Sequence, residues 1–278
     1  MRGHDTFSGY STNSFISADA RYAQLQDCLR FGITQLDELL VGALRPGSLV
    51  LFYGEWSRGS LRKFITQMTV SLLSSNPTVD IAFVDGANIF PYHDVSLEVR
   101  KQGYDPLKSL DRIQLARAFN YHQITEIVTK NLPQLIHERP TIRLIFVPQI
   151  SSQYLSEEAA QYLAYAKQPA IASLAELKTT VGKLKSLALQ YDLAVITTAE
   201  PAPHSRNKAL GGTFIAHAAT TVVRVSPDPA RGRQVTNYRF FLQQDPAHPE
   251  TVGQIKAQPL RMDHPLTLTR FLDPEIKD

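Results

Sequence analysis

The sequence lacks the features of a secreted or membrane-spanning protein. It has a single cysteine, Cys28, among 278 residues, which excludes an internal disulfide framework and fits a reducing compartment. No apolar run approaches the roughly eighteen residues of a membrane span, and the N-terminal segment has no signal-peptide core. We therefore expect an intracellular protein without a membrane partner, cytoplasmic in a prokaryote and nuclear in a eukaryote.

Charge of either sign is also modest. The formal net charge is +3 and the sequence pI is about 8.9. This is well short of the dense Lys and Arg clustering that a strong nucleic-acid binder shows. Charge alone therefore does not identify the partner.

What the sequence does contain is an alternation of short apolar runs and amphipathic segments. Short apolar strands separated by helices need crossover connections, which predicts a mostly parallel sheet covered on both faces. Two hairpin-like strands are expected after residue 225. The predicted strands are 48–53, 80–85, 113–118, 142–147, 193–197, 220–225, 236–243 and 253–258, and the predicted helices are 60–74, 92–103, 121–136 and 169–190.

The chain is expected to form one α/β domain preceded by an arm. Residues 1–20 are rich in Ser, Gly, Thr and Asn and predict a flexible arm, whereas residues 21–278 form the core domain. Neither an internal repeat nor a second hydrophobic core is apparent. Thr34 is expected to open a short helix before the first strand, with Asp37 as its capping partner.

A strand, a glycine-flanked loop and an amphipathic helix follow one another over residues 48–74, as in a P-loop. The P-loop pattern is G-x-x-x-x-G-K-[ST], and the segment here contains Gly54, Gly59, Ser60 and Leu61 at the four defined positions. The glycine spacing allows an anion-binding nest. Ser60 replaces the phosphate-contacting lysine, and Leu61 replaces the hydroxyl that holds Mg²⁺. The alternative is a plain strand–helix turn.

Several motifs in order resemble the RecA-fold recombinases, specifically archaeal RadA, its eukaryotic counterparts and their paralogues. The similarity extends from about residue 14 to about residue 258. The matching segments are 31–42, 54–56, 115–123 and 211–221, the last corresponding to the end of the second DNA-binding loop and the following strand. The resemblance implies a RecA-like P-loop core with a mainly parallel central sheet, flanking helices and C-terminal antiparallel strands. The helical N-terminal domain of full-length RadA is expected to be absent.

The positions that serve ATP hydrolysis in that family are altered. The resemblance places Ala87 at the glutamate that activates water, Pro148 at the aspartate of the magnesium site, and Thr198-Ala199 at the polar pair that senses the γ-phosphate. Phosphoryl transfer depends on charge neutralisation and positioning, which these residues do not supply. We therefore expect a pseudo-ATPase without a catalytic residue, metal or cofactor. A regulator that holds ATP without cleaving it is the alternative.

The arm carries a motif of the same family. Phe15-Ile-Ser-Ala18 matches the F-x-x-A polymerisation motif, which in the family adds as an edge strand to a neighbouring core. The resemblance places the receiving wall on four small residues of two neighbouring strands: Ala82, Val84, Ala116 and Ala118. Self-association, or association with a RadA-like recombinase or paralogue, is therefore expected. A disordered tail is the alternative.

The two expected DNA loops contain few basic residues. The first, 149–169, has Lys167 as its only one, and the second shrinks to 201–210, where Arg206 and Lys208 are available. Such residues contact phosphates without reading sequence. We therefore expect weak binding, mainly to single-stranded DNA, and a solvated polar loop is the alternative.

The resemblance implies a non-catalytic RadA-like recombinase paralogue in homologous recombination and DNA repair. It is expected to join or regulate a recombinase assembly and to modulate DNA binding. An Elongator-like RecA-fold scaffold subunit linked to tRNA is an alternative from another class. The arm motif and the match over 211–221 favour the recombinase paralogue.

Overall fold

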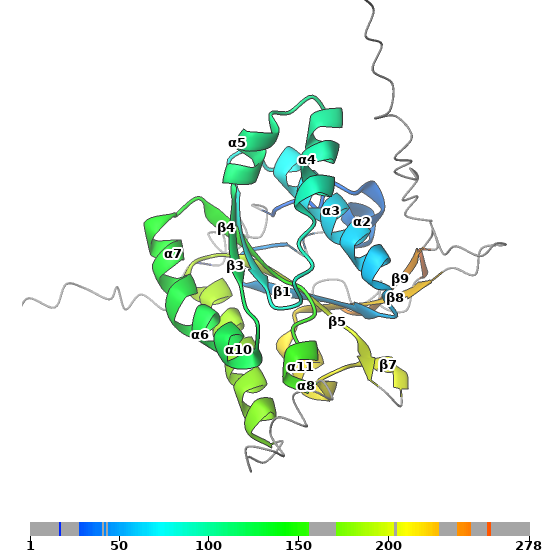
Figure 1. Ribbon diagram of the computed structural model, residues 1–278. Coiled ribbons are helices and arrows are strands. Elements are labelled where there is room, and N and C mark those ends of the chain that lie inside the picture. Colours follow the sequence, from blue (N-terminus) through cyan, green and yellow to red (C-terminus); the bar gives the residue numbers. More distant parts are fainter. Residues whose placement is uncertain are drawn as a thin grey trace, which may run out of the picture.

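An eight-stranded sheet between two layers of helices forms the core of the protein in a computed structural model (Figure 1). The structure describes residues 17, 28–40, 42, 44–155, 171–202, 205–227, 238–245 and 255–256. The strand order is β10-β9-β8-β1-β5-β4-β2-β3. The strands are β1 (Ser48–Gly54), β2 (Asp80–Asp85), β3 (Ile113–Arg117), β4 (Ile142–Val147), β5 (Ala194–Ala199), β8 (Thr221–Pro227), β9 (Tyr238–Gln244) and β10 (Ile255–Lys256).

The sheet is mainly parallel, as predicted. The six strands from β8 to β3 run in one direction, whereas β9 and β10 pair antiparallel at the other end of the sheet. Helices cover both faces of the sheet (Figure 1). The predicted α/β class with C-terminal antiparallel strands is therefore confirmed.

Alternate side chains of the central strands enter two hydrophobic clusters, one on each face of the same sheet, so the sheet has a second cluster that the sequence did not show. Phe52 and Phe83 pack under α2 (Thr34–Leu39), α3 (Arg58–Ser75), α4 (Tyr92–Lys101) and α5 (Pro106–Asp111). Leu51 and Val84 face the opposite layer, which contains α6 (Tyr121–Glu126), α7 (Leu132–Glu138), α10 (Ile171–Gln190) and α11 (Gly212–Ala218). Burial on both faces explains why these strands are continuous apolar runs in the sequence.

The start of helix α2 differs from the prediction in its capping. Ile33, without a side-chain hydrogen bond, occupies the N-cap position before Thr34. The Asp37 carboxylate instead accepts hydrogen bonds from the backbone N–H groups of Phe31, at 2.7 Å, and Gly32, at 3.0 Å. Asp37 therefore fastens the segment that precedes the helix, and the expected capping pair with Thr34 was wrong.

The helix predicted over 121–136 is continuous but contains a wider turn at its centre. Residues Ile127–Asn131 form a π-helical segment (η1) between α6 and α7. Pro133 has no N–H to donate, and its ring would press on the preceding turn of a regular α-helix. The π turn, in which the Leu132 N–H bonds to the Ile127 carbonyl, accommodates this proline. It faces the region of β2 and β3 and forms one wall of the groove described below.

The segment predicted as the second DNA loop, 201–210, contains a short antiparallel hairpin. Strand β6 (Pro201–Ala202) pairs with β7 (Ser205–Ala209), and α11 follows at once. Gly211, at the N-cap of α11, has a φ of +99°, and a Cβ there would collide with Ile215. Glycine is therefore required for this tight entry into the helix.

No helix within the described ranges is long and apolar enough to cross a membrane. Nor do three His, Cys, Asp or Glu side chains of these ranges gather where they could hold a metal ion.

Candidate functional site

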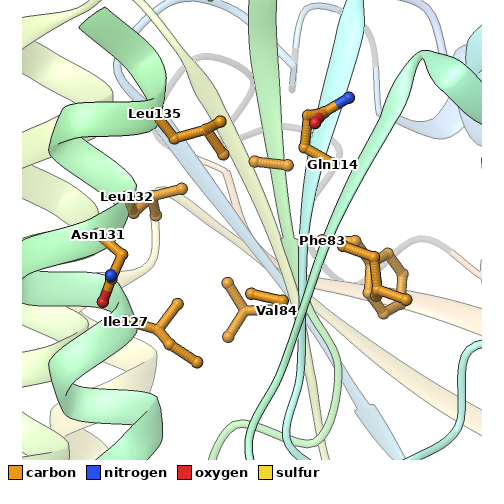
Figure 2. Close-up of a pocket in the computed structure, with 10 residues that line it drawn as sticks. Phe83, Val84, Gln114, Ile127, Asn131, Leu132 and Leu135 are labelled. Carbon is orange, nitrogen blue, oxygen red and sulfur yellow. The ribbon is translucent and has the colours of Figure 1, made fainter. Parts of the chain in front are cut away.

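An apolar groove of about 230 Å³ lies between the edge of the sheet and the helix that contains the π turn (Figure 2). Strand β3 is the last strand in the sheet order, and within the described residues its outer edge has no strand partner. An unpaired edge presents backbone N–H and C=O groups that an added strand can bind. The groove and the free edge together form a receptor for an extended segment.

Three of the four predicted wall residues line this groove. Ala82 and Val84 of β2 stand beside Gln114 and Ala116 of β3 in the parallel register, and all four contribute to the groove. Small side chains at these positions leave the space between strand and helix open. Ala118 does not line the groove, because it lies past the end of β3 and is buried in the core near α6.

The helical wall of the groove was not foreseen from the sequence. Ile127, Leu132 and Leu135 reach from the helix toward the strands, with Ile127 opposite Val84 (Figure 2). The signal in the sequence was Pro133, which marks an irregularity in the helix but does not show which residues it turns toward the sheet. Phe15 and Ala18, the expected occupants, lie outside the described residues.

A network of hydrogen bonds joins the helix that contains the π turn, which forms one wall of the groove, to α8 and α10. The Tyr154 hydroxyl, on α8 (Ser152–Leu155), lies 3.0 Å from Thr125 Oγ1 of α6 and 2.9 Å from Thr180 Oγ1 of α10. Thr125 Oγ1 also donates to Glu176 Oε2 at 3.1 Å, and His122 Nδ1 lies 3.0 Å from Glu176 Oε1. Burial raises the pKa of Tyr154 to about 12, so the phenol is neutral throughout the physiological range.

The altered phosphate loop forms a closed helix start. Helix α3 begins at Arg58, and Ser57 is its N-cap. Ser57 Oγ accepts a hydrogen bond from the Ser60 N–H at 3.1 Å, while Ser60 Oγ donates to the Ser57 carbonyl at 2.9 Å. One of the N–H groups in the first turn of this helix, that of Ser60, therefore already has an intramolecular partner. The next side chain, Leu61, is fully buried in the first core.

The two glycines of the loop do not build the nest that their spacing allows. A nest alternates right- and left-handed backbone conformations, and neither Gly54 nor Gly59 is among the glycines with positive φ. A Cβ on Gly54 would collide with the carbonyl oxygen of Val225, so close packing of β1 on β8 accounts for this glycine. Gly59 lies in the first turn of α3 and has open space around it. The loop therefore does not form the anion-binding nest that the glycine spacing allows.

Ala87 lies in a loop that a buried carboxylate organises. Asp85 is fully buried at the end of β2 and accepts backbone hydrogen bonds from Ile89, at 2.9 and 3.0 Å, and from Phe90, at 3.0 Å. Ala87 itself is partly buried against the first core. The acid in this loop therefore serves as a backbone cap.

Pro148 follows β4, where two strand ends are joined by neutral hydrogen bonds. The Gln149 N–H donates to Thr198 Oγ1 at 2.8 Å, and Thr197 Oγ1 donates to the Val147 carbonyl at 2.8 Å. Thr198 and Ala199 are fully buried. The carboxyl ends of β4 and β5 are thus bound to each other.

The predicted DNA-binding residues lie on the exposed hairpin strand β7. Arg206 is 85% exposed and its Nε lies 2.9 Å from Glu55 Oε1 of the altered loop, which is 45% exposed. Lys208 is exposed on the same strand. A third basic group, Arg224 of β8, donates from Nη1 to Asn207 Oδ1 at 2.8 Å. Arg224 was missed because it lies within a strand that is otherwise apolar.

The sequence was also compared with known protein families. A family model described as Rad51 matches residues 24–256. The match covers more than half of the chain and includes every strand of the sheet, the edge groove, the altered loop and the β6–β7 hairpin. Phe15 and Ala18 precede the matched region.

Proposed function

The chain belongs to the Rad51 family, and from this premise we propose that it is a non-catalytic member that joins or regulates a recombinase assembly through its edge groove. The family match supports a recombinase-like role in homologous recombination and repair, on a RecA-like core. It also favours this role over the Elongator-like scaffold. The observation that carries the finer proposal is the apolar groove beside the unpaired edge of β3.

The groove is suited to a phenylalanine anchored on an added strand. Its volume of about 230 Å³ exceeds what one aromatic side chain needs, and Ala82, Val84, Leu132 and Leu135 make it apolar. Moving a phenylalanine side chain from water into such a groove contributes on the order of 2–3 kcal/mol. Backbone hydrogen bonds to β3 add direction. Phe15 of this chain, or the equivalent residue of a recombinase partner, has the required chemistry.

The altered loop supports the absence of ATP hydrolysis. The residues do not fit Mg²⁺-ATP, since Ser60 cannot neutralise phosphate charge and the buried Leu61 cannot ligate a hard cation. The Ser60 N–H is engaged by Ser57, and Pro148 has no ligand atom in its side chain. In this proposal, the family's ATP chemistry belongs to the partner recombinase.

Contact with DNA is proposed to be weak and independent of sequence. Arg206 and Lys208 are exposed, but Arg206 already pairs with Glu55. Few phosphate contacts give low affinity and a shallow slope of log affinity against log salt, about one unit for each contact. Modulation of DNA binding therefore acts mainly through the partner.

The test is association of the full chain with a recombinase of the same organism. Ala116→Glu places a charge in the groove, where burial without a partner is costly. We expect its association, measured by light scattering and by titration, to weaken at least tenfold. Lys108→Glu, on the exposed surface of α5, is the matched control and should leave association unchanged. Equal binding by wild type and Ala116→Glu would remove the groove from the proposal.

A further inference from the structure

The turn between α4 and α5 presents two large hydrophobic side chains to solvent. Leu107 is 80% exposed and Tyr104 is 50% exposed, so most of the leucine and half of the tyrosine lie outside the core. They are two of the five large hydrophobic side chains that the described residues expose, and only three positions separate them. Single exposed apolar residues are ordinary on a protein surface, but two on one turn form an apolar spot that a partner can cover.

The backbone of this turn is fixed on both sides. At the end of α4 the Tyr104 N–H donates to the Val99 carbonyl at 3.1 Å, which is the longer of the two bonds of a Schellman motif. Gly103 has a φ of +84°, a value that favours glycine. Asp105 then caps α5, accepting a hydrogen bond from the Leu107 N–H at 2.9 Å. The turn therefore holds both hydrophobic side chains on ordered backbone.

This order favours binding over mere exposure. In a Schellman motif the residue at the position of Tyr104 commonly packs on the last turns of the helix, whereas here half of the tyrosine remains in water. A backbone that is already fixed loses little conformational entropy when a partner covers it. Tyrosine and arginine are also enriched among the residues that dominate binding energy at interfaces. The turn therefore has the properties of a preformed contact surface.

The charges beside the apolar spot that have no partner are positive. The side chains of Arg100 and Lys108 are exposed, and neither forms an ion pair within the described residues. The four carboxylates of residues 92–111 are all engaged, by ion pairs or by a helix cap: Asp94 with Arg62, Glu98 with Lys101, Asp111 with Arg139, and Asp105 at the start of α5. Two free cations therefore flank Tyr104 and Leu107 in the chain.

We propose that the surface formed by Arg100, Tyr104, Leu107 and Lys108 docks an acidic segment of a partner protein. In this proposal an apolar residue of the segment covers the leucine and the tyrosine, while carboxylates on either side of it pair with the two cations. A guanidinium binds a carboxylate through two parallel hydrogen bonds, which adds direction to the contact. No residue of this surface lines the groove, so the proposal goes beyond the proposed function and does not depend on it.

The test is titration of the full chain with a labelled synthetic peptide in which leucine and phenylalanine are flanked by glutamates. We expect saturable binding by fluorescence anisotropy at about 50 mM salt, and weaker binding at about 500 mM because the ion pairs are screened. Leu107→Ser and the double variant Arg100→Ser/Lys108→Ser should each weaken binding at least fivefold. Leu189→Ser, at a leucine of α10 that is 57% exposed, is the matched control and should bind as wild type. Because all of these side chains are exposed, the urea unfolding midpoints should stay unchanged.

The outcomes separate this surface from the groove. Absence of binding to wild type, or equal binding by Leu107→Ser and Leu189→Ser, would overturn the proposal. Equal binding of a peptide with glutamine in place of glutamate would overturn it too, since the surface would then not select acidic segments. A loss of binding in Ala116→Glu would place the peptide in the groove and overturn the proposal while leaving the proposed function intact. Recombinase association that Ala116→Glu does not weaken would instead count against the proposed function alone.

Discussion

Two regions of the same sheet differ in how their space is filled: the carboxyl ends of the central strands and the lateral edge at β3. At the carboxyl ends of β1, β4 and β5, where the family binds nucleotide, hydrogen bonds and core packing occupy the site: Ser57 caps Ser60, Thr198 binds Gln149, and Leu61 is buried. At the lateral edge, alanine and valine side chains leave a groove of about 230 Å³ beside unpaired backbone within the described residues.

In the function proposed above, this difference would allow the fold to keep assembly without catalysis. ATP chemistry requires charged groups and metal ligands at fixed points, and the residues that the resemblance places there, Ser60, Leu61, Ala87 and Pro148, are neutral or apolar. Strand addition requires only small side chains and a free edge. The second requirement survives in this chain on residues that are otherwise ordinary core residues of β2 and β3.

The largest expected effect concerns the altered phosphate loop, and it tests whether restoring the P-loop residues restores ATP hydrolysis. In Ser60→Lys/Leu61→Thr the P-loop pattern is restored, but a fully buried leucine is replaced by a hydroxyl-bearing side chain. We expect the free energy of unfolding in urea to fall by about 2–4 kcal/mol. Phosphate release should stay at background with or without single-stranded DNA, as in wild type. Lys63→Thr, exposed on the same helix, should change stability by less than about 0.5 kcal/mol.

Magnesium-dependent turnover in wild type that disappears in Ser60→Ala would break the comparison, because the loop would then be a working site.

The next effect concerns the hydrogen bonds of Tyr154, which hold the helix that forms one wall of the groove. Burial raises the folded-state pKa of Tyr154 to about 12, whereas the unfolded phenol titrates near its ordinary value of 10. The folded state then binds more protons between these two values, so stability is present below pH 10 and is lost as the pH rises toward 12. The linked loss is up to about 2–3 kcal/mol. Tyr154→Phe should remove this part of the alkaline slope, measured by urea unfolding between pH 9 and about 11.5.

Tyr191→Phe, on a partly buried residue past the end of α10, is the control for the loss of a tyrosine hydroxyl. An unchanged slope in Tyr154→Phe would mean that the phenol ionises freely and that the network does not fix the helix.

The third effect separates the groove from its occupant. A labelled peptide of residues 10–20 should bind the wild-type chain, and the same peptide with Phe15→Glu should bind at least tenfold more weakly, because it brings a charge to an apolar groove. Ala116→Glu should bind the unaltered peptide at least tenfold more weakly than wild type does, since its groove carries a charge. Fluorescence anisotropy provides the measurement, and Lys108→Glu, outside the groove, should bind the peptide as wild type does. Equal binding of the two peptides would show that the groove does not take the arm motif.

Most of the sheet was predictable because its strands are buried on both faces. Asp80–Asp85 and Ile142–Val147 have the predicted bounds, since each is a continuous apolar run bordered by polar turns. The β6–β7 hairpin was not predicted, because Ser205–Ala209 is mostly polar and shows no alternation of apolar and polar residues. Its strand character depends on pairing with β6 rather than on local propensity.

The sequence predicted only those residues of the candidate site whose role depends on the small size of the side chain. The small residues Ala82, Val84 and Ala116 were placed from the resemblance, and the structure brings them together. Ala118 has the same size but lies past the strand end, a difference of position that composition does not show. The contact of Arg224 with Asn207 joins residues of two different sheets and could not be inferred from one strand.

The smallest expected effect concerns the ion pair between Glu55 of the altered loop and Arg206 of the β6–β7 hairpin. Glu55 lies 2.9 Å from Arg206, so in the free protein the loop carboxylate competes with phosphate for that guanidinium. Both groups are exposed, and such a pair is worth less than about 1 kcal/mol. Glu55→Gln should therefore strengthen binding to single-stranded DNA by no more than about fivefold, whereas Arg206→Ala and Lys208→Ala should each lower the salt slope by about one unit. Anisotropy titrations from about 50 to 200 mM salt measure both quantities. If Glu55→Gln weakens binding, Glu55 orients Arg206 for phosphate instead of competing for it, and the altered loop still contributes to nucleic-acid binding through a residue that never belonged to its ATP chemistry.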